Sequence, residues 1–335
     1  MDQVLFACHA GPGVGLGHLK RILVAARAIQ KNLDLEIDLL VAGDAEYKKF
    51  TVGFQTTFTQ KGESLEAVIM KMLYTKKYKM LCIDAYEELL TSKFQQVLDF
   101  AVAQKIKIVT IDLLSKFTEN IDLIYVPSFL EPEVKLSTYN KSKVVFGWDC
   151  FLLSLDKPKE KIVSNKVLIL TGGSDSTNLG STWPTILNQS LPLGTKIEWV
   201  TGPFSKSPLF PKFPTVDFTE IIAPLNLSLI MIEAKLAATI YGVSFFELLA
   251  LGVPTVVFNP YGVKNSKEIS EIKKLDISLV ASDAIEASQM LKTLIRSRSL
   301  QKSLASRASN FLKRYSGERF AEEVQLLLRD DRKET

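Results

Sequence analysis

Residues 3–31 read QVLFACHAGPGVGLGHLKRILVAARAIQK, and this stretch decides the fold. Residues 3–8 form a short apolar run of the kind that makes a buried strand. Glycine alternates with other residues over 11–17, which predicts a loop. From residue 18 to 31 the apolar side chains recur at helical spacing, namely Leu19, Ile22, Leu23, Ala26 and Ile29. A strand, a glycine loop and a helix in this order predict the first βα unit of a parallel sheet.

The same alternation continues along the chain and predicts two Rossmann-like halves. In the first half we expect strands at 36–41, 80–83, 107–111 and 123–126, with helices at 65–74 and 89–103. In the second half we expect strands at 166–170, 196–200, 237–240 and 255–258, with helices at 182–190 and from 244 and 264. The polar stretch 154–165 (SLDKPKEKIVSN) lacks periodicity and predicts a linker. The prediction is an α/β protein with two domains, 1–150 and 151–335, whose second domain ends in helices over 284–328.

Composition argues against several kinds of partner and compartment. Lys and Arg outnumber Asp and Glu by only 41 to 37, without a dense basic block, so we expect no nucleic acid partner. Cys8, Cys82 and Cys150 lie far apart among apolar residues, which favours buried thiols in a reducing cytoplasm over a disulfide framework. The sequence shows no secretory leader and no run of about 18 apolar residues, so we expect a cytoplasmic protein without a transmembrane segment.

The first of three candidate binding segments is the glycine loop at 11–17. Open parallel sheets bind ligands at the carboxyl ends of their strands, and glycines there expose N–H groups that favour an anion. The dinucleotide fingerprint G-x-G-x-x-G fails, because Leu16 or His18 takes the place of the third glycine. His18 falls in the first helical turn, where the helix dipole favours a neutral imidazole that can accept a proton. The alternative is a loop for strand–helix packing with an exposed histidine.

The second candidate segment is LTGGSDSTNL at 170–179, directly after the first strand of the second half. Its two glycines let the backbone approach a pyrophosphate, and Ser174 adds a hydroxyl. Asp175 would repel a phosphate, so we expect it to cap a helix or organise the loop. A plain turn is the alternative for the whole segment.

The third candidate segment is IYGVSFFELLALGVP at 240–254, which reads as a strand end, a turn and a helix. Ser244 and Glu247 have the S-x-x-E spacing of a capping box, in which Glu247 reaches back to the helix start. A carboxylate at this place is equally suited to accept hydrogen bonds from the hydroxyls of a ribose. The local sequence leaves both interpretations of Glu247 open.

Four motifs together resemble the glycosyltransferase-B (GT-B) superfamily. They are GLGHLKRILVAAR at 15–27, IDAYEEL at 83–89, GGSDSTNL at 172–179 and SFFELLALGVP at 244–254. Their order and spacing are most similar to the UDP-diacetamido-trideoxy-sugar hydrolases of bacterial pseudaminic acid biosynthesis, relatives of the lipid II-forming N-acetylglucosaminyltransferase. The resemblance covers most of the chain. It implies a GT-B fold, a role in cell-surface glycan biosynthesis, and a UDP-linked N-acetylated sugar bound in the cleft between the halves.

The resemblance also implies roles for individual residues. His18 matches the family's catalytic base, and Tyr86 matches a tyrosine beside the reacting sugar. The glycine loop of the second half matches the diphosphate site, and Glu247 matches the ribose ligand. The residues expected to bind substrate are Gly15, Gly17, Arg21, Gly172, Gly173, Ser174, Ser244, Glu247 and Asn265. No metal or cofactor is expected, because the chain has no Asp-x-Asp pair and only two histidines, His9 and His18.

The sequence departs from these hydrolases at two places. Ala7-Cys8-His9 stands where the hydrolases have Arg-x-Asp, and Asp84-Ala85-Tyr86 stands where they have Asp-His-Tyr. Both departures fall beside the expected sugar site. The nucleotide half therefore matches the family better than the sugar half.

Four functions follow from these observations. The leading one is a hydrolase in which His18 activates water to cleave the anomeric C–O bond of a UDP-sugar and release UDP. A glycosyltransferase would use the same donor site, and for a lipid acceptor it would need peripheral membrane contact, for which 68–79 (VIMKMLYTKKYK) is the candidate. The third function is that of a non-catalytic nucleotide-sugar binder. The fourth, a nicotinamide-dependent oxidoreductase, is suggested by the fold alone. The oligomeric state does not follow from the sequence.

Overall fold

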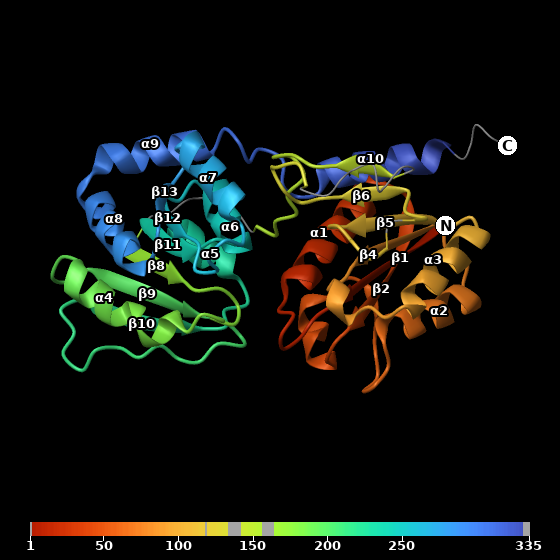
Figure 1. Cartoon of the computed structure of the whole chain (residues 1–335), viewed down its shortest axis with the longest axis horizontal. Helices are drawn as coiled ribbons and strands as arrows, with labels where there is room; N and C mark the ends of the chain where they lie inside the picture. The colour runs from red at the N-terminus through yellow and green to blue at the C-terminus, as the bar shows by residue number, and fades with distance from the viewer. Residues whose placement is uncertain (1, 118, 133–141, 156–163, 331–335) are drawn as a thin grey trace. The chain divides into compact units, whose positions relative to one another are not determined.

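The computed structural model describes residues 2–117, 119–132, 142–155 and 164–330. The chain divides into two compact units, of which unit 1 comprises Met1–Ser154 with Arg314–Thr335 and unit 2 comprises Leu155–Lys313. Each unit is a parallel β-sheet covered by helices, as Figure 1 shows. The predicted α/β class with two Rossmann-like domains is therefore confirmed. Most of the predicted linker, residues 156–163, lies outside the described residues.

In the described part of unit 1, seven strands form one sheet in the order β3-β2-β1-β4-β5-β6-β7. The strands are β1 (Asp2–His9), β2 (Leu35–Ala42), β3 (Gln55–Phe58), β4 (Met80–Asp84), β5 (Lys107–Ile111), β6 (Leu123–Tyr125) and β7 (Lys143–Val145). The helices are α1 (Gly17–Asn32), α2 (Leu65–Thr75), α3 (Lys93–Ala103) and α10 (Glu318–Asp330), with short 3-10 turns η1 (Ala45–Phe50) and η2 (Glu87–Leu89). The strand order reverses direction between β1 and β4, and such a reversal opens a crevice at the carboxyl ends of the strands.

Helices α2 and α3 cover one face of the unit 1 sheet. The side chains of Leu65, Ile69, Phe94 and Leu98 are buried in one cluster with the sheet residues Leu5 and Leu81. The stretch 68–79, considered above as a membrane contact, lies largely in α2, and its Val68, Ile69 and Leu73 belong to the same buried cluster. Tyr74 is exposed, but its ring centroid lies 4.5 Å from that of Phe100. This stretch is thus an amphipathic helix whose apolar face is already used in the core.

The C-terminal helix α10 belongs to unit 1, whereas the sequence analysis assigned it to the second domain. Phe320 is fully buried, and its ring centroid lies 5.1 Å from that of Tyr125 and 6.4 Å from that of Phe6. Gly317 makes this approach possible, since a Cβ there would lie 2.8 Å from the Cβ of Ala28 in α1. The apolar face of α10 therefore completes the core of unit 1 rather than that of unit 2. Figure 1 shows α10 in blue beside β6.

Unit 2 repeats the plan with six strands, counted over its described residues, in the order β10-β9-β8-β11-β12-β13. They are β8 (Lys166–Leu170), β9 (Lys196–Thr201), β10 (Asp217–Ile222), β11 (Leu236–Ile240), β12 (Thr255–Phe258) and β13 (Leu279–Ala281). The helices are α4 (Trp183–Ser190), α5 (Leu227–Glu233), α6 (Val243–Ala250), α7 (Ser266–Leu275), α8 (Ala284–Arg296) and α9 (Arg298–Ala308), preceded by the turn η4 (Leu179–Ser181). Trp183 is buried against Trp199 and Phe258 at its centre. The order reverses between β8 and β11, so this unit has its own crevice position.

Two other predictions can be compared with the structure. Cys8, Cys82 and Cys150 are free and buried, which confirms the prediction of buried thiols. Among the described residues, no helix is both long and apolar enough to cross a membrane.

Candidate active site

The glycine loop of unit 1 closes on itself and delivers the start of α1 to the carboxyl edge of the sheet. The N–H of Gly15 donates to the carbonyl of Gly11 over 2.7 Å, and Gly13 and Gly15 have φ angles of +83° and +79° that suit glycine. Helix α1 then begins at Gly17 without a side-chain cap at its N-cap residue, Leu16. His18 is therefore the second residue of the helix, in its first turn, as predicted.

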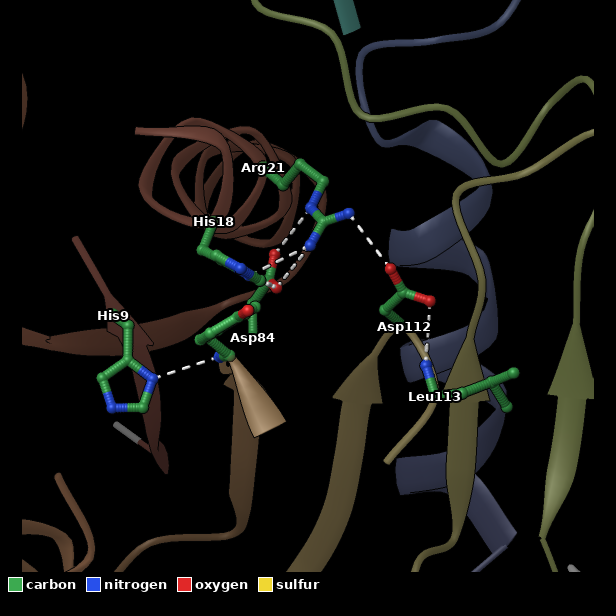
Figure 2. A network of polar contacts seen from close by, with 7 residues as sticks. His9, His18, Arg21, Asp84, Asp112 and Leu113 are labelled. Carbon is green, nitrogen blue, oxygen red and sulfur yellow. Dashed lines mark hydrogen bonds and ion pairs between the residues drawn. The ribbon is translucent and has the colours of Figure 1, made fainter. Parts of the chain in front are cut away.

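His18 forms a close pair with Asp84, the last residue of β4. The two residues lie on neighbouring elements of the crevice, and Nδ1 of His18 is 2.5 Å from Oδ1 of Asp84 (Figure 2). The Asp84 side chain has no solvent exposure, whereas the His18 side chain keeps 17%. A contact this short between an imidazole nitrogen and a carboxylate oxygen carries a proton, so Nδ1–H of His18 donates to Asp84. The other ring nitrogen, Nε2, is then the one that can accept a proton.

Arg21 lies one turn further along α1 and contacts two carboxylates. Its Nε donates to Oδ2 of Asp84 over 2.9 Å, and its Nη2 donates to Oδ1 over 2.7 Å. Its Nη1 donates to Oδ2 of Asp112, directly after β5, over 3.3 Å. Burial opposes the charge of Arg21, but the two carboxylates outweigh it and raise the pKa of the guanidinium. Arg21, expected to bind substrate, is thus placed as the centre of an ion-pair network.

His9 and Tyr86 are the other two ring-bearing residues near His18. The backbone N–H of Tyr86 donates to Nδ1 of His9 over 3.1 Å, so Nε2 of His9 carries the proton of the neutral ring. Burial and, second, the neighbouring His18 lower the pKa of His9 to about 4. The ring of Tyr86 is half exposed, and its centroid lies 6.4 Å from that of His18. The structure thus brings the ring of Tyr86 close to that of His18, while the predicted contact of Tyr86 with a sugar stays a prediction.

A cavity of about 600 Å³ opens next to His9 in unit 1. It is lined by the last residues of β1 and β2, the residues that follow β2 and β3, the first residue of α2 and the last residue of η2, namely His9, Ala42, Gly43, Asp44, Ala45, Thr59, Gln60, Lys61, Gly62, Glu63, Ser64, Leu65 and Leu89. Glu63 accepts a hydrogen bond from the backbone N–H of Gln60 over 2.8 Å, which orders the loop before α2. The lining mixes backbone, carboxylates and an imidazole, a composition that suits a ligand with several hydroxyl or amide groups.

In unit 2 the loop after β8 offers a ligand mostly backbone groups. Gly172 and Gly173 follow β8, with Gly172 at φ +86°, and the N–H of Phe204 donates to the carbonyl of Gly173 over 3.0 Å. Both carboxylate oxygens of Asp175 accept backbone hydrogen bonds, from Leu179 over 3.0 Å and from Gly180 over 2.8 Å. The prediction that Asp175 organises the loop is therefore confirmed. Gly173 and Ser174 are exposed at the tip.

The start of α6 differs from the predicted capping box. The helix begins at Val243 after Gly242, with no hydrogen bond from a side chain to its start, and Ser244 is its second residue rather than its cap. Glu247 is only 4% exposed, so most of its carboxylate is buried within unit 2. Asn265 precedes α7 in a left-handed conformation with φ +62°. These three residues thus lie after β11 and β12, at the carboxyl edge of the unit 2 sheet.

The sequence analysis missed the two carboxylates that organise this site. Asp84 was noted only as part of the Asp84-Ala85-Tyr86 motif, without a role of its own, and Asp112 was not singled out. Both lie where a buried parallel strand ends, which is where such sheets place ligand-binding residues. A charged residue directly after an apolar strand was the signal that could have found them. Among the described residues, no group of three or more His, Cys, Asp and Glu side chains is arranged to hold a metal ion.

No protein-family model and no curated protein matches the chain. Solved structures do match it over nearly its whole length. MurG of Acinetobacter baumannii is 13% identical, with a TM-score of 0.62 over 97% of this chain and 99% of that one. UGT2 of Phytolacca americana with UDP-2-fluoro-glucose and pterostilbene is 12% identical, with a TM-score of 0.61 over 97% and 99%. S. aureus MnaA with UDP is 14% identical, with a TM-score of 0.64 over 98% and 97%.

These likenesses establish the architecture. The fold is GT-B. The resemblance to the GT-B superfamily is thereby confirmed at the level of fold, while membership of the pseudaminic acid hydrolases stays a prediction.

Proposed function

We propose that this protein is an enzyme that transfers the sugar of a UDP-sugar to a hydroxyl group of an acceptor. The observation that carries the proposal is the pairing of His18 with the buried carboxylate of Asp84 at the crevice position of unit 1. An imidazole held by a carboxylate through Nδ1 is a general base whose charged form the carboxylate stabilises. The GT-B neighbours that bind UDP or a UDP-sugar support UDP as the nucleotide.

The proposed reaction is a displacement at the anomeric carbon. Nε2 of His18 takes the proton of the acceptor hydroxyl while its oxygen bonds to the anomeric carbon. The bond from that carbon to the diphosphate oxygen breaks, and UDP leaves with the electron pair. The carboxylate of Asp84 balances the imidazolium formed on His18. No group changes its oxidation state in this reaction.

The cavity beside His9 supports transfer to an acceptor. Its volume of about 600 Å³ lies within the range of pockets that enclose small molecules. Asp44 and Glu63 at its wall suit an acceptor with hydroxyl groups, which donate hydrogen bonds to carboxylates. Tyr86 would lie next to the reacting sugar, through its exposed ring beside His18.

Unit 2 is proposed to hold the nucleotide. The exposed amides at Gly173 and Ser174 and the uncapped start of α6 at Ser244 suit the diphosphate, because such N–H groups bind anions. Gly17 offers a similar amide at the start of α1, whereas the N–H of Gly15, also expected to bind substrate, already donates to Gly11. Asn265 and Glu247 are proposed contacts of the nucleoside, with Glu247 at its ribose. The free buried cysteines support a reducing compartment, the cytoplasm.

Hydrolysis of the UDP-sugar is the second candidate. Water would take the place of the acceptor hydroxyl, and a free sugar would be released. The resemblance to the diacetamido-trideoxy-sugar hydrolases, in which His18 matches the catalytic base and Tyr86 matches a tyrosine beside the sugar, favours this candidate. The route would then belong to cell-surface glycan biosynthesis.

The test is a panel of UDP-sugars, with UDP release and product mass measured with and without candidate acceptor alcohols. A conjugate supports the transferase, a free sugar supports the hydrolase, and tight UDP-sugar binding without turnover contradicts both. In the same assay we expect His18→Gln to lower turnover about a thousandfold while UDP affinity stays within about twofold. Undiminished turnover in that variant would contradict the proposed role of His18 as the general base. Arg27→Met, an exposed change on the same helix, is the control.

A further inference from the structure

One ring nitrogen of His18 faces two competing partners. Its Nδ1 is 2.5 Å from Oδ1 of Asp84 and 3.1 Å from Nη2 of Arg21. The same Nη2 is 2.7 Å from that Asp84 oxygen, so the three groups converge on one point (Figure 2). A neutral imidazole nitrogen either carries a proton and donates or lacks one and accepts. His18 can therefore satisfy only one of the two partners through Nδ1.

The choice of partner decides whether His18 is a base. When Nδ1–H donates to Asp84, Nε2 has a free electron pair and accepts a proton from substrate. When Nδ1 accepts from the N–H of Arg21, the proton of the ring sits on Nε2, and that nitrogen cannot act as a base. The orientation of the Arg21 guanidinium is therefore coupled to the tautomer of His18.

Asp112 holds the guanidinium from its far side. Its Oδ2 accepts from Nη1 of Arg21 over 3.3 Å, and its Oδ1 accepts from the backbone N–H of Leu113 over 3.0 Å. The residue itself has φ +75°, a conformation that Asp and Asn tolerate better than most side chains. Asp112 thus anchors one end of Arg21 to the turn after β5, which leaves Nε and Nη2 directed at Asp84.

We propose that Asp112 is a positioning residue that holds the Arg21 guanidinium on Asp84 and away from Nδ1 of His18, which keeps the His18 ring in the Nδ1–H tautomer. The importance of this tautomer for turnover rests on the proposed role of His18 as a base. The tautomer of the His18 ring itself does not depend on which substrate the protein binds.

The experiment measures the tautomer of each histidine by ¹⁵N NMR in protein without substrate. The chain has only two histidines, and His18→Gln assigns their signals. His9 serves as an internal reference of the Nε2–H form, since its Nδ1 accepts from the backbone of Tyr86. In the native protein we expect the opposite, Nδ1–H, form for His18. An Nε2–H signal for His18 at neutral pH would overturn the proposal.

The two variants should differ in the tautomer of His18. In Asp112→Asn, which suits the same backbone conformation, we expect the Nε2–H form of His18 to gain population, because Arg21 is released toward Nδ1. In Arg21→Met we expect the Nδ1–H form to remain, because the competing N–H donor is gone. Arg27→Met removes the same charge from the exposed side of α1 and should change neither signal.

The outcomes separate this proposal from the proposed function. Unchanged His9 signals show that unit 1 remains folded in each variant, and Asp112→Asn still tests the proposal if Arg21→Met does not fold. A His18 signal in Asp112→Asn identical to the native one, or a shift of His18 to the Nε2–H form in Arg21→Met, would overturn the positioning role. A confirmed tautomer together with no turnover of any UDP-sugar would contradict the proposed function and leave the positioning role standing.

Discussion

The carboxyl edges of the two sheets occupy equivalent places in the two units but carry different chemical groups. In unit 1 the edge consists of charged and ionisable side chains, with Arg21 bound to Asp84 and His18 paired with the same carboxylate. In unit 2 the edge combines the glycine backbone of Gly172 and Gly173 with Ser244, Glu247 and Asn265, and both carboxylate oxygens of Asp175 accept from local amides. The first edge is suited to move a proton, and the second to accept an anion through N–H groups.

This difference predicts which substitutions each unit will tolerate. A buried network of charges fails when one member is removed, because the remaining charge stays buried without its partner. A backbone site fails when a side chain fills the space that a ligand needs. Substitutions at the two edges should therefore have different effects.

The largest effect is expected for Asp84→Asn. It takes the charge from the buried residue that both His18 and Arg21 contact, so turnover should fall about a hundredfold or more. Stability should fall by about 3–5 kcal/mol, since the guanidinium of Arg21 loses its main partner. Steady-state kinetics and denaturant unfolding measure the two effects. Asp34→Asn, exposed on the same unit, is the matched control. Undiminished turnover and stability would contradict the network.

Phe320→Ala tests the assignment of α10 to unit 1. The ring is fully buried against Phe6 and Tyr125, so its loss should cost about 3–5 kcal/mol of unfolding free energy. Leu326→Ala removes an exposed apolar side chain from the same helix and should cost well under about 1 kcal/mol. Denaturant unfolding compares the two variants. Equal losses would show that α10 does not complete this core.

Several features of the fold followed from the sequence, and the failures share a cause. All the central strands of both sheets were predicted, because they are buried runs of apolar residues. The strands that were missed, β3, β7, β10 and β13, are the edge strands of the two sheets. Edge strands are short and partly exposed, as the alternating exposure of β3 and β10 shows, so their apolar signal is weak. Helix α10 was predicted as a helix, but its amphipathic pattern does not say which sheet it covers.

The candidate site was predicted in part for a similar reason. His18 and Tyr86 belong to local motifs, and the structure places their rings near each other. The ion pairs of Arg21 join residues 63 and 91 positions apart, and no local pattern encodes such a pairing. A basic residue on a helix more often faces solvent, so only the packing of α1 on the sheet shows that Arg21 is enclosed.

His9 makes the stability of unit 1 depend on pH. Its pKa of about 4 in the folded protein lies below the value near 6.5 of an unfolded chain, so the unfolded state binds more protons between these values. Stability should therefore fall as the pH drops from about 6.5 to 4, by up to about 3 kcal/mol. Denaturant unfolding at several pH values measures the slope. His9→Gln should reduce it, and an unchanged slope in that variant would assign it to other groups.

The smallest effect is expected for Gly173→Ala in unit 2. A Cβ at Gly173 would meet nothing within 4 Å, so stability should change by less than about 0.5 kcal/mol. If the exposed amides of this loop bind the diphosphate, the methyl group should lower UDP affinity about tenfold while the His18 signals of unit 1 stay unchanged. Gly202→Ala is the contrast, since its Cβ would lie 2.4 Å from the carbonyl oxygen of Gly173 and should reduce both stability and affinity. Calorimetric titration with UDP measures the affinity of each variant. Native affinity in Gly173→Ala would show that the diphosphate does not bind at this loop.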